Sequence, residues 1–247
     1  MEPYLLQGII RPERAHLSFS LSLPFTYSFY PGLHTAIVSV SFNQVSVWVD
    51  TEASWDIYDL RNLVKDIVQD QLAIIGYMLG YAYDLEITRV LSREREIDFI
   101  FGIDIPCLAA RNQGQDISTK LALMHQKCIG ENGAFLRRCL NDLTSAMKHP
   151  VDTGFYCYRA LESLRHHCAA MHSLTGSSKD KQWAKFREIT GVSQESVMLI
   201  KRSADFTRHG EPIDVTGEER AKLFTVTWDI VDAYLAQVIA HSVETVG

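Results

Sequence analysis

The chain has 247 residues, 47% hydrophobic and 22% charged, a composition typical of a folded globular protein and not of a disordered chain. Its formal net charge of −6 excludes a protein that coats nucleic acid through bulk positive charge. The longest apolar run, Leu72 to Tyr83, is too short to cross a bilayer, so we expect no membrane association.

The cysteines indicate a reducing compartment. They are odd in number and form no CxxC pair, and Met1 leads into Glu2 and Pro3, not into a basic signal-peptide region. We therefore expect buried, reduced thiols in a cytoplasmic protein. The five are Cys107, Cys128, Cys139, Cys157 and Cys168.

The first half of the chain alternates apolar and polar residues, which is the period of a half-buried strand. Residues 17–30 and 35–50 show this pattern, with a turn predicted at Pro31-Gly32 and a hairpin tip at Asn43-Gln44. We assign the tryptophans in this region, Trp48 and Trp55, to the core in preference to a recognition surface.

The period then changes to that of an amphipathic helix. Apolar residues recur every three or four positions from Ile57 to Leu79, and Ser54 or Asp56 can cap the start. Strand character returns at 84–91 and 97–105. Residues 110–116 are polar and turn-rich, so we place a boundary at 112/113.

Beyond this boundary the pattern predicts helices only, near 117–129, 132–148, 153–174, 181–189, 194–209 and 217–241. Predicted caps include Ser193 and a capping box from Thr216 to Glu219. The fold class is therefore α+β. A strand-rich domain with one long helix (1–112), regulatory or partner-binding, is followed by an all-α helical bundle (113–247).

The sequence lacks the GxxxxGK[ST], GxGxxG, HExxH and GxSxG motifs. His166, His167 and Cys168 adjoin one another, but adjacent helical side chains point apart, so they do not make a zinc site. We predict no metal and no cofactor.

One candidate site stands out at the end of the helix predicted at 194–209. Arg202 and His209 are seven residues apart, which is close to two helical turns, so both leave one face, and Asp205 lies between them. Gly210 and Pro212 predict that the helix stops there, where its negative dipole end favours an imidazolium. The same residues also fit a purely structural, salt-bridged helix end.

The surroundings of this site are locally basic. From Arg159 to Gly210 there are nine Lys/Arg against five Asp/Glu, although the whole chain is acidic. A basic face on an acidic body is compatible with a restricted polyanion site, and equally with an ordinary solvated surface.

Metal-free RNA cleavage needs a base for the ribose 2′-hydroxyl, an acid for the leaving 5′-oxygen and cations that stabilise the phosphorane. One His and one Arg per chain are too few for both proton transfers. Two chains related by a two-fold axis supply two of each. A catalytic interpretation therefore predicts a homodimer with the helix 194–209 near the axis.

Residues 132–239 resemble a HEPN domain (higher eukaryotes and prokaryotes nucleotide-binding), whose motif is Arg, four to six residues, then His. Arg202 and His209 fit the long end of that spacing, and Tyr158-Arg159-Ala160-Leu161-Glu162 resembles the family's aromatic–x–Ala–Leu–Glu helix. Catalytic members commonly carry Asn, Asp or His directly after the motif Arg, where this chain has Ser203.

The resemblance implies a metal-independent endoribonuclease. Arg202 then binds the scissile phosphate, His209 transfers protons and Asp205 orients either one, while Arg208, Lys201 and Arg159 contact RNA. The resemblance also implies homodimerisation and a context of phage defence or toxin–antitoxin pairing, with an antitoxin or defence-complex protein as partner. The alternative is a non-catalytic scaffold, dimerising or nucleotide-binding, in which Arg202, Asp205 and His209 form a structural network.

Overall fold

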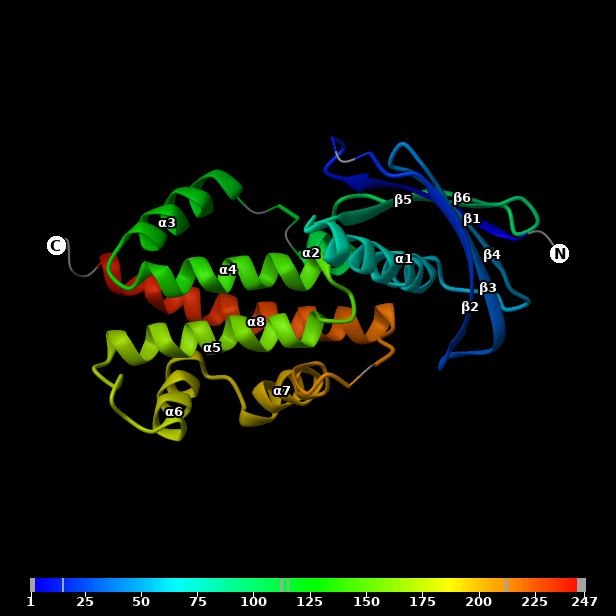
Figure 1. Cartoon of the computed structure of the whole chain (residues 1–247). Helices are drawn as coiled ribbons and strands as arrows, with labels where there is room; N and C mark the ends of the chain where they lie inside the picture. The colour runs from blue at the N-terminus through cyan, green and yellow to red at the C-terminus, as the bar shows by residue number, and fades with distance from the viewer. Residues whose placement is uncertain (1–2, 15, 112, 115, 212, 244–247) are drawn as a thin grey trace. The chain divides into compact units, whose positions relative to one another are not determined.

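A computed structural model describes residues 3–14, 16–111, 113–114, 116–211 and 213–243, so Pro212 and position 112 of the predicted boundary lie outside the described residues. The chain divides into two compact units, Met1–Ile103 and Asp104–Gly247 (Figure 1). The observed division precedes 112/113 because a short helix, α2 (Pro106–Arg111), belongs to the second unit, where Leu108 enters the helical core.

The first unit is a six-stranded antiparallel sheet of order β2-β3-β4-β1-β5-β6. Inward-pointing residues on alternate positions, such as Leu6, Val38 and Val47, pack against the apolar stripe of α1. Asp56 caps α1 by accepting hydrogen bonds from the backbone N–H groups of Tyr58 and Asp59, as predicted. The elements are β1 (Tyr4–Arg11), β2 (Phe19–Tyr27), β3 (Tyr30–Ser41), β4 (Gln44–Asp50), α1 (Ile57–Leu79), β5 (Asp84–Ser92) and β6 (Ile97–Ile100).

Several details of the sheet differ from the sequence-based expectations. The turn between β2 and β3 is formed by Ser28 and Phe29, because Tyr27 pairs with Tyr30, and the predicted turn at Pro31-Gly32 lies inside β3. The β3–β4 tip uses Phe42 and Asn43, both at positive φ, one residue before the predicted position. The predicted strand 97–105 ends at Ile100, and β1 was not expected.

Trp48 corrects the prediction that both tryptophans are core residues. Trp55 is buried, but Trp48 is 41% exposed because its neighbours Val47 and Val49 take the inward positions of β4. Register places Trp48 between Ile37 of β3 and Leu5 of β1 on the outer face of the sheet.

The second unit is all-helical over its described residues, as predicted, and α5 is its central helix (Figure 1). Apolar residues of α5 such as Leu161 and Leu164 are fully buried against Leu136, Phe186, Ile200 and Phe224. The remaining helices are α3 (Ile117–Ile129), α4 (Gly133–Lys148), α5 (Thr153–Met171), α6 (Lys179–Thr190), α7 (Gln194–Arg208) and α8 (Gly217–Val243).

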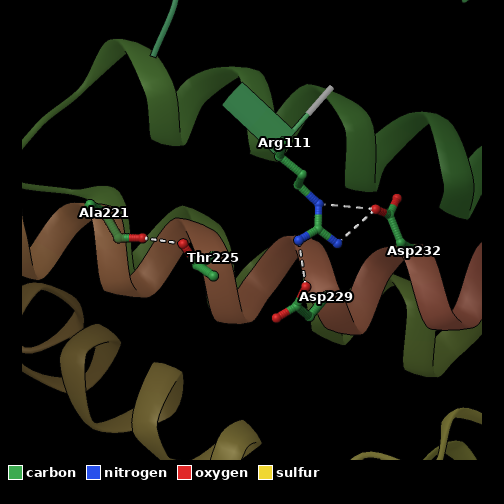
Figure 2. A network of polar contacts seen from close by, with 5 residues as sticks. All are labelled: Arg111, Ala221, Thr225, Asp229 and Asp232. Atoms are coloured by element: carbon green, nitrogen blue, oxygen red, sulfur yellow. Dashed lines mark hydrogen bonds and ion pairs between the residues drawn. The ribbon is translucent and has the colours of Figure 1, made fainter. Parts of the chain in front are cut away.

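Predicted caps fix the starts of α7 and α8, and ion pairs with α8 hold the end of α2. The hydroxyl of Ser193 accepts from Ser196 N at 3.0 Å, and Thr216 and Glu219 form the predicted capping box. Figure 2 shows how α2 is attached: its last residue, Arg111, donates to Asp229 and, at 2.9 Å, to Asp232 of α8.

Within the described part of the chain, no helix combines the length and apolar content of a membrane span.

Candidate functional site on helix α7

Helix α7 carries the predicted motif on its solvent-facing side. Arg202 and His209 are both exposed, whereas Val197, Ile200 and Ala204 are buried on the opposite side against the core. His209 is the C-terminal cap. Its backbone N–H donates to the carbonyl oxygen of Asp205 at 3.1 Å, and a bond to the residue four positions earlier is the hydrogen bond of an α-helix. The helical register therefore continues to His209, and Arg202 and His209 share a face.

Asp205 does not orient either of these residues, contrary to the expectation. It pairs with Arg208, with Asp205 Oδ1 3.0 Å from Arg208 Nη2. Helical side chains lean towards the N-terminus, so Arg208 leans back onto Asp205, whereas Arg202, which precedes Asp205, leans away from it. Among the described residues, no carboxylate forms an ion pair with Arg202 or His209.

An exposed aromatic ring lies between the two motif residues. Phe206 is four residues after Arg202 and three before His209, so it occupies the same helix face, and it is 49% exposed. Sequence reasoning did not single it out, although the spacing Arg202, Phe206, His209 was visible. An apolar ring flanked by two cationic or titratable groups is suited to contact a base or a second protein surface.

The other predicted RNA contacts have different environments. Arg159 of α5 donates to the buried carboxylate of Asp142, and its guanidinium lies 5.2 Å from the centre of the Tyr156 ring, so it is held in place as a structural cation. Glu162, in the same helix, pairs with Lys179 at 2.6 Å. Lys201 lines a cleft between α6 and α7, described next.

This cleft brings together residues from three helices of the second unit. Tyr158 of α5, Trp183 and Arg187 of α6, and Lys201 of α7 line a space of about 390 Å³. The helical spacing of Trp183 with Arg187, and of Gln194 with Lys201, was the signal available in the sequence. Only the packing of three helices shows that these two stripes converge.

The reactive side chains of the second unit differ in their surroundings. Among the described residues, no group of three His, Cys, Asp or Glu is placed to hold a metal ion. Burial raises the pKa of the Cys157 and Cys168 thiols to about 11, which makes them inert as nucleophiles at neutral pH. An exposed guanidinium and an exposed imidazole on α7 remain, and these can contact phosphate and exchange protons.

Comparison with known proteins places both units in one family of unknown function. The family is DUF8168, described as a domain of unknown function. Its N-terminal domain matches residues 4–101, and its C-terminal domain matches residues 121–239. The two matches thus fall one in each unit. No curated protein and no solved structure matches the chain.

Proposed function

We propose that the chain is a metal-independent endoribonuclease of HEPN type that acts as a homodimer. The observation that carries the proposal is that Arg202 and His209 lie on one exposed face of α7, with no carboxylate of the described chain paired to either. The alternative of a structural network needs Asp205 to pair with these two residues, whereas Asp205 pairs with Arg208. The all-helical second unit and the helix containing Tyr158 and Glu162 support the resemblance.

In this proposal Arg202 and His209 have separate roles, phosphate binding and proton transfer. Arg202 binds the scissile phosphate and stabilises the charge that accumulates on it when the ribose 2′-oxygen attacks. His209 of one protomer removes the 2′-hydroxyl proton, and His209 of the other protonates the departing 5′-oxygen. The products are a 2′,3′-cyclic phosphate and a 5′-hydroxyl. No metal is required, because all charges in this scheme are held by side chains.

The dimer is an integral part of the proposal, since each chain supplies one histidine of this motif. Phe206 supports it, because an exposed ring between Arg202 and His209 would be covered if α7 met its symmetry mate near a two-fold axis. Lys201 and Arg208 would extend the RNA-binding surface, and the sheet-containing unit would regulate the enzyme or bind a partner. A role in phage defence or a toxin–antitoxin pair rests on the resemblance.

The test is RNA cleavage by purified protein in EDTA. We expect Arg202→Ala and His209→Ala each to reduce cleavage by about a hundredfold or more, and EDTA to have no effect. Arg138→Ala and His125→Ala are matched controls, since both residues are exposed on other helices of the same unit. Undiminished cleavage by His209→Ala would refute the assigned role. No cleavage by the wild type, with normal folding, would favour the non-catalytic scaffold.

A further inference from the structure

The cleft between α6 and α7 has the composition of an anion-binding site. Its lining includes three cationic side chains, Lys179, Arg187 and Lys201, and a single carboxylate, Asp180. Lys179 is already paired with Glu162. Arg187 and Lys201 form no ion pair with any carboxylate in the described part of the chain. Two unpaired cations in one concavity of an acidic protein favour a negatively charged occupant.

The inner wall of the cleft is aromatic and rigid. Tyr158 and Trp183 are stacked with ring centres 6.2 Å apart, and the guanidinium of Arg165 lies 5.6 Å from the Trp183 ring. Burial raises the pKa of Tyr158 to about 12, so its hydroxyl keeps its proton at neutral pH and can donate a hydrogen bond. Apolar side chains of Val197 and Met198 complete the lining.

We propose that this cleft binds a phosphate group carried by a nucleotide, with Arg187 and Lys201 as its cationic contacts and Tyr158 as a neutral donor. The volume of about 390 Å³ is within the range of small-ligand sites. The nucleotide is either free or one unit of an RNA strand, because both present the same phosphate chemistry. Binding here does not require cleavage, so the inference can hold without ribonuclease activity, and it shares only Lys201 with the RNA-binding surface of the proposed function.

The position of Lys201 explains why this is a second site. Lys201 and Arg202 are consecutive, so their side chains leave α7 about 100° apart. Lys201 continues the stripe of Gln194 and Met198 into the cleft, whereas Arg202 continues to Phe206 and His209. A strand that passed from one stripe to the other would contact both sites.

Isothermal titration calorimetry on the full chain tests the inference with pyrophosphate, AMP, ATP and a short 2′-O-methyl RNA that cannot be cleaved. We expect Arg187→Gln and Lys201→Gln each to weaken binding by about tenfold or more, the loss expected for one charge-assisted hydrogen bond. Tyr158→Phe should weaken binding less. Lys185→Gln is the matched control, because Lys185 lies on α6, is paired with Glu188 and does not line the cleft.

The outcomes separate the two sources of phosphate. Binding of AMP or ATP that both glutamine variants weaken assigns the cleft to free nucleotides. Binding of the RNA alone, weakened by the same variants, assigns it to an RNA strand. Absence of binding by every ligand at millimolar concentration, or equal losses in Lys185→Gln, overturns the inference. The ribonuclease proposal is tested by cleavage and this inference by ligand binding, so either one can fail without the other.

Discussion

Gly154 of α5 lies against Ser203 of α7 with no space between them. A Cβ atom added at Gly154 would be 2.2 Å from Ser203 Oγ and 2.9 Å from the Ser203 carbonyl carbon. The close approach needs glycine on one helix and a small residue on the other. Ser203 directly follows Arg202, so this contact fixes the helix that carries Arg202 and His209 on the central helix of its unit.

Gly154→Ala should therefore destabilise the protein. The added methyl group meets the backbone of α7 as well as the Ser203 side chain, so relaxation of one rotamer cannot accommodate it. We expect the free energy of unfolding to fall by about 1–3 kcal/mol, measured by chemical denaturation. Gly176→Ala is the control, since nothing lies within 4 Å of its added Cβ. Equal stability of the two variants would contradict the close crossing.

Lowering the pH should destabilise the fold through His167. This histidine is 2% exposed, its Nδ1 shares a hydrogen bond of 2.7 Å with the Tyr234 hydroxyl, and burial lowers its pKa to about 4. The unfolded chain, with a pKa near 6.5, binds the proton first as the pH falls. The stability from neutral His167 is thus complete above about pH 6.5 and is lost progressively towards pH 4.

The measurement is the melting temperature between pH 7 and pH 4. His167→Gln removes the titrating group, so its melting temperature should depend less steeply on pH than that of the wild type, whatever its value at pH 7. His125→Gln, at an exposed position of α3, should keep the wild-type slope. A slope that is identical in all three proteins would exclude His167 as the cause.

Arg220 should be essential for stability although it is charged. It is 4% exposed and donates to Thr153 Oγ1 at 2.9 Å and to the Met147 carbonyl at 3.3 Å, near the C-terminal end of α4. Arg220→Leu leaves these acceptors unsatisfied, and we expect a loss of about 2 kcal/mol or more in the free energy of unfolding. Arg220→Lys should not restore it, because lysine lacks the planar fork. Arg138→Leu, at an exposed site, should change stability little.

Phe206→Glu should produce a monomer if the proposed α7 interface forms. A charge at the centre of the Arg202, Phe206 and His209 face would oppose burial against a symmetry mate. Light scattering at micromolar concentration should give the dimer mass for the wild type and the monomer mass for the variant, and RNA cleavage should fall in parallel. Met171→Glu replaces another exposed apolar residue of the same unit and should remain dimeric. A wild-type monomer that cleaves RNA would refute the dimer mechanism.

The sequence by itself determined the fold class, because the pattern of apolar residues depends on local geometry. The change from period two to period 3.6 identified the strands other than β1, and helix α1 begins and ends at Ile57 and Leu79 as predicted. The caps at Ser193 and Thr216 were also readable, since a cap bonds to residues two or three positions away.

Only the tertiary structure decided which surface side chains are free and which are paired. The sequence does not show whether Arg159 or Arg202 has a partner. In the structure Arg159 donates to Asp142 of α4, while Arg202 is exposed. The cleft at Lys201 likewise combines residues from α5, α6 and α7. Such relationships join positions far apart in the chain, and their geometry is set by helix packing, which local periodicity does not encode.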